Sequence, residues 1–127
     1  MTESQMEAIA ARIQTALAAT DVTEFSDLLH PGVRWGGPDD PNPGCHNRQQ
    51  VLSWYQRGRD AGVRAEVTEC LVFDSRVLIG TRIRGNDLAD EAGGEVDRWQ
   101  VFTVRGGQIV DIVGCDNRPE ALARAAG

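Results

Sequence analysis

The sequence predicts an α+β fold, with helices in the first half of the chain and an antiparallel meander in the second half. In the first sixty residues, apolar side chains recur at steps of three and four, which is the spacing of amphipathic helices. From Val63 onward the apolar period becomes two and β-branched residues dominate, which is typical of strands. The 127 residues, 41% of them hydrophobic, suffice for one core, so residues 1–127 are expected to form one domain.

The first helix is expected from about Ser4 to Ala19. Thr2 and Ser4 can each begin a capping box, in which side chains satisfy the unpaired N–H groups of the first turn. Asp21 can cap a short second helix over residues 22–29, which must end before Pro31 because proline disfavours helical backbone in the residue preceding it. The buried stripe of the first helix is expected to consist of Met6, Ile9, Ala10, Ile13, Ala16 and Leu17.

A short strand over residues 33–36 and a third helix are expected next. The stretch between them, residues 36–47, is rich in Gly, Pro, Asp and Asn and is expected to be irregular. Asn47 is a suitable N-cap for the third helix, because its side-chain oxygen can accept a hydrogen bond from an N–H group of the first turn. One face of that helix carries Val51, Trp54, Tyr55 and Gly58.

Four strands are expected in the second half, over residues 63–73, 76–85, 97–105 and 108–115. Asp74-Ser75 and Gly106-Gly107 are expected to form tight turns. Residues 86–95 are acidic and lack periodicity, so they are expected to form a mobile connection.

Charge and composition exclude several classes of partner. The formal charge of −6 disfavours binding to nucleic acid or to an anionic membrane surface. The chain has no apolar run of about 20 residues and no signal-peptide pattern at its start, so a cytoplasmic protein is expected. Three cysteines without C-x-x-C spacing are expected to be free thiols, and two histidines cannot form a three-histidine site, so neither a metal nor a cofactor is expected.

The order of these elements resembles that of SnoaL-like proteins in the nuclear transport factor two superfamily, which also contains the ketosteroid isomerases. LLHPGVRWGGP, GCHNRQQVLSWY and FTVRGGQIVDI resemble three local segments of that family. The resemblance implies three N-terminal helices packed on a strongly curved, mostly antiparallel sheet that forms a cone-shaped pocket. It also implies a homodimer that associates through the convex face of the sheet.

Strand alternation allows the two faces of the expected sheet to be assigned. The side chains expected on the concave face are Leu78, Gly80, Arg82, Gln100, Phe102, Ile112, Gly114 and Asp116. Those expected on the convex face are Ile79, Thr81, Ile83, Trp99, Val101, Thr103, Asp111 and Val113. A convex face with this many apolar side chains is expected to be buried. A second copy of the chain, a terminal segment or the chain's own helices could bury it.

The catalytic patterns of this superfamily are incomplete in the chain. At the positions where ketosteroid isomerases carry a tyrosine and two aspartates, the sequence has Ile13, Gln100 and Gly37. The last strand, residues 109–114, lacks the histidine and final aspartate of the polyketide cyclases. Of the acid–arginine–acid set of limonene-type epoxide hydrolases, only Arg82 is present, with Asp116 as the nearest carboxylate on the last strand.

Arg82 and Asp116 are the candidate catalytic residues, because they are expected on one face, where an ion pair could orient a ligand or a water. A purely structural ion pair is the alternative. Cys45 precedes a helix N-terminus, where the helix dipole can activate a thiol, although its neighbour His46 would point to the opposite side. The candidate ligand-binding residues are Trp35, Cys45, Trp54, Tyr55, Gln100 and Phe102, with ordinary core packing as the alternative for the aromatic ones.

Three functions remain open on this basis. The first is a protein that binds a small, largely apolar organic molecule in the cone-shaped pocket. The second is an isomerase, polyketide cyclase or epoxide-hydrolase-like enzyme with non-standard catalytic residues, which a buried Asp116 would favour. The third is a dimerising interaction module whose cavity is filled by side chains.

Overall fold

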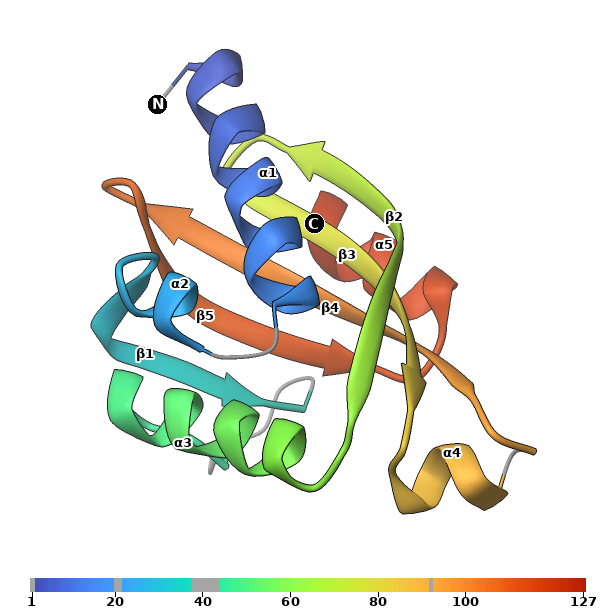
Figure 1. Cartoon of the computed structure of the whole chain (residues 1–127). Coiled ribbons are helices and arrows are strands. Elements are labelled where there is room, and N and C mark those ends of the chain that lie inside the picture. The colour runs from blue at the N-terminus through green and yellow to red at the C-terminus, as the bar shows by residue number, and fades with distance from the viewer. Residues whose placement is uncertain (1, 20–21, 38–43, 92) are drawn as a thin grey trace.

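The computed structural model describes residues 2–19, 22–37, 44–91 and 93–127 and confirms the α+β class (Figure 1). The expected cap Asp21 and residues 38–43 of the expected irregular stretch lie outside the described ranges. The elements in chain order are α1 (Glu3–Ala18), α2 (Thr23–Ser26), β1 (Leu29–Gly36), α3 (Arg48–Asp60), β2 (Arg64–Phe73), β3 (Arg76–Arg84), α4 (Asp87–Glu91), β4 (Val96–Arg105), β5 (Gln108–Cys115) and α5 (Arg118–Ala126).

The strands form one five-stranded mixed sheet in the order β1-β5-β4-β3-β2. Strands β2 to β5 form the expected antiparallel meander, and β1 pairs in parallel with β5. The strand β1 begins four residues earlier than expected, because Leu29 already pairs with Ile109. That pairing ends the second helix at Ser26 instead of residue 29.

The sequence signals of α1 and α3 are confirmed. Thr2 accepts a hydrogen bond from the Gln5 N–H, and the Gln5 side chain accepts one from the Thr2 N–H, which completes the capping box. Asn47 caps α3 by accepting a hydrogen bond from the Gln50 N–H at 2.9 Å. The buried residues of α1 are the six expected ones: Met6, Ile9, Ala10, Ile13, Ala16 and Leu17.

Two helices were not expected from the sequence. The helix α4 lies within residues 86–95, where the Asn86 side chain accepts a hydrogen bond from the Ala89 N–H at 2.7 Å and Ala89 is buried. The expectation of an irregular connection is therefore wrong for Asp87–Glu91. The C-terminal helix α5 has clear signals in the sequence, an Asn117 N-cap followed by proline in the first turn.

The helices cover both faces of the sheet. Figure 1 shows α1, α2 and α3 on one face, here called the inner face, and α5 on the opposite, outer face. The inner core joins residues of α1, α2 and α3 to side chains of the sheet such as Ile79, Phe102 and Ile112. The outer core joins Ala121 and Ala125 of α5 to Leu78, Val101 and Cys115.

The expected face assignment is confirmed for β4 and β5 and wrong for β3. Leu78 lies opposite Val101 and Gly80 lies opposite Trp99 in the antiparallel register, so Leu78, Gly80 and Arg82 belong to the outer face. Their alternates Ile79, Thr81 and Ile83 belong to the inner face. A shift of one residue in the assumed alternation assigns every side chain of a strand to the opposite face. In β3 the five consecutive residues 77–81 are all buried, so their pattern does not indicate which side chains point to the inner face.

The helix α5 covers part of the outer face, which was one of the alternatives to a second copy of the chain. Trp99 and Val113 pack against this outer core but stay partly exposed. The homodimer stays a prediction. None of the helices in the described ranges has the length and apolar composition of a bilayer-spanning segment.

Candidate functional site

Four aromatic rings meet where α3 packs against β1 and α2. We call Phe25, Trp35, Trp54 and Tyr55 the aromatic corner. The Tyr55 ring stacks with the rings of Phe25 and Trp35, with centroid distances of 5.0 and 4.8 Å. Trp54 contacts Trp35 edge-on at 4.8 Å and is 52% exposed. Because Trp54 and Tyr55 are consecutive on a helix, they point to different sides, and only Tyr55 enters the core.

Tyr55 connects the aromatic corner to the inner face of β4. Its hydroxyl donates a hydrogen bond to the Gln100 side-chain oxygen at 3.4 Å, and the Arg59 guanidinium lies 5.4 Å from the centre of its ring. Burial raises the pKa of the Tyr55 hydroxyl well above its ordinary value, so the phenol is neutral at physiological pH. Phe102, the next inner-face residue on β4 after Gln100, is fully buried.

A second group of residues lies at the end of the inner face beyond Gln100. Gly114 is the cross-strand neighbour of Gln100 and projects no side chain. A Cβ placed on Gly114 would lie 3.9 Å from Arg98 Nη2 and 4.0 Å from Trp35 Nε1. Arg98 forms an ion pair with Asp116 at 3.2 Å. We call Trp35, Arg98, Gly114 and Asp116 the open corner.

Two nitrogen groups of the open corner keep hydrogen-bonding capacity. The ion pair uses one nitrogen of Arg98, whose side chain is 36% exposed. Among the described residues, the Trp35 Nε1–H group has no hydrogen-bond partner. Fully buried side-chain nitrogens in these residues all have partners, so this N–H group is at least partly accessible.

Sequence reasoning missed Arg98, a positive charge on the inner face of β4. The signal was present, because Arg98 precedes Gln100 by two residues and must share its face. Asp116 does lie at this end of the sheet, as expected, and its side chain is 82% exposed.

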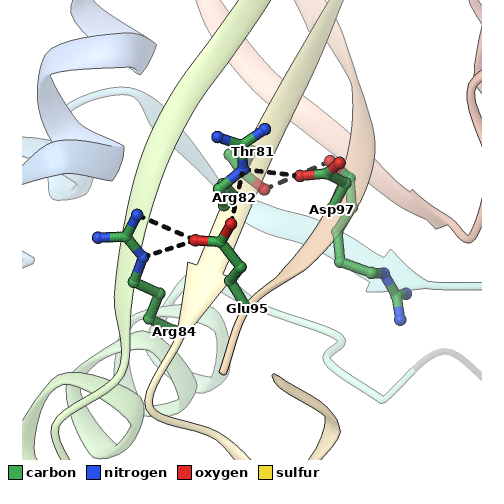
Figure 2. A network of polar contacts seen from close by, with 6 residues as sticks. Thr81, Arg82, Arg84, Glu95 and Asp97 are labelled. Atoms are coloured by element: carbon green, nitrogen blue, oxygen red, sulfur yellow. Dashed lines mark hydrogen bonds and ion pairs between the residues drawn. The ribbon is translucent and has the colours of Figure 1, made fainter. Parts of the chain in front are cut away.

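The expected ion pair between Arg82 and Asp116 is wrong. Arg82 lies on the outer face, where its guanidinium bonds to Asp97 at 3.2 Å and approaches Glu95 at 3.9 Å. Figure 2 shows this surface network, in which Glu95 also pairs with Arg84 at 3.0 Å. The cause is the register, which places Arg82 directly opposite Asp97 and on the opposite side of the sheet from the open corner.

Cys45 lies beside the aromatic corner but has the environment of a structural thiol. Its backbone N–H and C=O both bond to Trp35 at 3.1 Å. Burial raises the pKa of the Cys45 thiol, although the charge of Arg57 lowers it in part. The thiol is therefore protonated near neutral pH, which disfavours a nucleophilic role. All three cysteines are unpaired.

The six expected ligand-binding residues fall into two places. Cys45 and Trp54 border a surface groove of about 680 Å³, whose other walls are Gly44, Gln49, Gln50, Ser53, Gln56 and Arg57. Tyr55, Gln100 and Phe102 belong to the inner face, and Trp35 contacts both sets. A larger groove of about 1100 Å³ runs between the start of α1 and the turns at Asp74 and Gly106, away from these residues. Within the described ranges, no group of three or more His, Cys, Asp or Glu residues could hold a metal ion.

Comparison with known proteins identifies the fold and the family. A family model described as the SnoaL-like domain matches residues 10–112. A protein of unknown function from Mesorhizobium loti, described as similar to nuclear transport factor two, is 20% identical with a TM-score of 0.71, over 91% of this chain and 93% of that one. Bal32a, from a soil-derived mobile gene cassette, is 19% identical with a TM-score of 0.71, over 98% of both chains.

A de novo designed protein with a curved β-sheet has the same fold. It is 17% identical with a TM-score of 0.70, over 97% of this chain and 96% of the designed one. A search of the curated proteins finds no match. At these identities the structural likeness establishes the fold alone, so the function has to be argued from the site.

Proposed function

The chain belongs to the SnoaL-like domain family, and on that basis we propose that it binds a small, flat, largely apolar organic molecule at the open end of a cone-shaped pocket. The observation that carries the proposal is the meeting of Arg98 Nη2 and Trp35 Nε1 at Gly114, where these are the nearest atoms of the described residues to an added Cβ, at 3.9 and 4.0 Å. Aromatic surface and polar groups with spare hydrogen-bonding capacity meet there, as they do in most small-molecule sites.

The position of the ligand follows from what is already filled. In the middle of the inner face, Ile79, Phe102 and Ile112 are fully buried and pack with the helices. A ligand therefore binds beside Trp35, where the rings of the aromatic corner supply a flat apolar wall. Gln100 adds a polar group next to the aromatic corner, because its side-chain oxygen accepts a hydrogen bond from the Tyr55 hydroxyl at 3.4 Å.

A fluorescence titration tests the proposal with 2-naphthamide, a flat and uncharged probe. Binding beside Trp35 is expected to change the tryptophan emission and to saturate with a Kd of about 0.1–1 mM, the range for a ligand of this size. Gly114→Ala places a methyl group in the proposed site without a close contact, since its nearest neighbours lie at 3.9 and 4.0 Å. This variant should fold normally and bind the probe more weakly.

Gly58→Ala is the matched control. It adds the same methyl group at a helix position where the nearest atoms, both of Val63, lie at 3.8 and 3.9 Å. Its affinity for the probe should equal that of the unmodified protein. If Gly114→Ala binds 2-naphthamide as tightly as Gly58→Ala does, the ligand does not lie at the open corner.

A filled interaction module is the second candidate function. It is favoured by the closed centre of the inner face, where Val77, Ile79 and Phe102 are all fully buried. An emission spectrum that stays unchanged up to millimolar 2-naphthamide would support this candidate over the first. The enzyme alternative has less support, because Asp116 is an exposed, ion-paired carboxylate, whereas proton transfer near neutral pH usually relies on buried acids.

A further inference from the structure

The open corner brings two kinds of hydrogen-bond donor to one position on β5. Arg98 Nη2 and Trp35 Nε1 both lie about 4 Å from the point where a Cβ of Gly114 would be, at 3.9 and 4.0 Å. An arginine guanidinium presents its N–H groups in a planar fork that matches a carboxylate, and an indole N–H can only donate. These two nearest groups are therefore donors, and one of them is charged; Arg98 Nη2 is also the nitrogen that pairs with Asp116 at 3.2 Å.

Resting on the function proposed above, we infer that the ligand is an aromatic or conjugated carboxylate. Its carboxylate lies above Gly114 and accepts hydrogen bonds from the Arg98 guanidinium and the Trp35 indole N–H. Its flat apolar part packs against the aromatic corner. Charge-assisted hydrogen bonds of this kind are about twice as strong as neutral ones, so the charge of the ligand decides its affinity.

Asp116 acts in this arrangement as an internal substitute for the carboxylate of the ligand. It contacts Arg98 through one oxygen at 3.2 Å, and its side chain is 82% exposed. An exposed ion pair of this kind contributes little to stability and is readily exchanged. Asp116 consequently competes with the ligand for Arg98, a role opposite to that of a catalytic acid.

The overall charge of the chain does not oppose this inference. The formal charge is −6, but charges more than about 8 Å apart are largely screened at physiological ionic strength. On the inner face, Arg98 lies beside Gly114, whereas Glu95 and Asp97 pair with Arg82 and Arg84 in the network of Figure 2. Among the described residues, the ion pair next to Gly114 is that of Arg98 with Asp116.

The experiment compares 2-naphthoate with 2-naphthamide, which have nearly the same shape and differ in charge. The unmodified protein should bind 2-naphthoate about tenfold more tightly than the amide. Arg98→Gln should abolish the preference for 2-naphthoate and leave the Kd of 2-naphthamide unchanged. Arg98→Lys keeps the charge but loses the planar fork of N–H groups, so it should retain part of the preference. Arg82→Gln, on the outer face, is the matched control and should retain all of it.

Asp116→Asn provides an independent readout. Removal of the competing carboxylate should tighten 2-naphthoate binding about two- to fivefold and leave the amide unaffected. A catalytic or ligand-orienting Asp116 would give unchanged or weaker binding, and that result would contradict the competition. Thermal unfolding of each variant confirms that it is folded before its affinity is compared.

The outcomes separate the inference from the function on which it rests. If both probes bind equally, or if Arg98→Gln keeps the preference for 2-naphthoate, the carboxylate inference is wrong and the binding function stands. If neither probe binds, both are wrong. A preference for 2-naphthoate that disappears only with Arg98 supports both.

Discussion

Arg59 is the side chain that joins the two helices next to the site, and its replacement is the sharpest test of the packing. From α3 it reaches the C-terminal end of α1, where its Nε donates to the Ala19 carbonyl at 2.6 Å. Its Nη2 donates to the carbonyls of Leu17 and Ala16 at 2.9 and 3.2 Å. The last carbonyls of a helix lack partners within the helix, and a cation there also stabilises the helix dipole.

Arg59→Met keeps most of the apolar stem and removes these three hydrogen bonds. Each hydrogen bond contributes about 1 kcal/mol to the free energy of unfolding, and water can partly replace it at the end of the helix. The expected loss of unfolding free energy is therefore about 2–3 kcal/mol. For the 127 residues, an unfolding entropy of about 2.1 cal/mol/K per residue converts this loss to a decrease in Tm of about 7–11 °C.

Differential scanning calorimetry measures the decrease. Arg57→Met is the matched control, because Arg57 is an exposed arginine on the same helix, and its Tm should change by less than about 2 °C. Arg59→Lys, which keeps the charge without the fork, should fall between the two. If Arg59→Met and Arg57→Met melt at the same temperature, Arg59 does not hold α1 against α3.

Two further predictions concern the outer face. Gly80→Ala should destabilise the protein by about 1–3 kcal/mol in a denaturation experiment, because the added Cβ would lie 2.8 Å from Glu69 Cγ and 3.2 Å from Trp99 Nε1. Gly114→Ala, which adds the same methyl group without a close contact, should have almost no effect. Hydrogen bonds from Arg118 and Trp99 hold the pKa of Glu69 below its usual range, so the stability from Glu69 is present at neutral pH and is lost as the pH falls below about 4.3. Unfolding measured at several pH values should therefore show a smaller acid loss for Glu69→Gln, and an equal loss would contradict the assignment.

The elements with strong local signals could be predicted from the sequence. The stripe of α1, its capping box and the Asn47 cap of α3 depend on neighbours within a few residues, and all three are confirmed. The family resemblance could also be predicted, because it depends on the order of elements along the chain. The C-terminal helix α5 had an equally local signal in Asn117 and the proline that follows, which sequence reasoning did not use.

The candidate site could be predicted only in part. Alternation placed Gln100, Phe102, Gly114 and Asp116 on the correct face, as the pairing of Gln100 with Gly114 and the ion pair of Arg98 with Asp116 show. It failed for β3, and with it the pairing of Arg82 with Asp116 failed. The actual partner of Asp116 is Arg98, and both come from adjacent strands whose contact depends on register.

The sequence by itself determined the class of fold and the order of α1, α2, α3 and the five strands, because capping and periodicity are local properties of the chain. Only the tertiary structure decided which face of β3 meets the helices, since residues 77–81 are buried on both sides and alternation gives no sign of direction. The antiparallel register with β4 and the cover of the outer face by α5 settle that choice. Because register is a relation between distant segments, it is also what brings Arg98 and Asp116 together above Gly114.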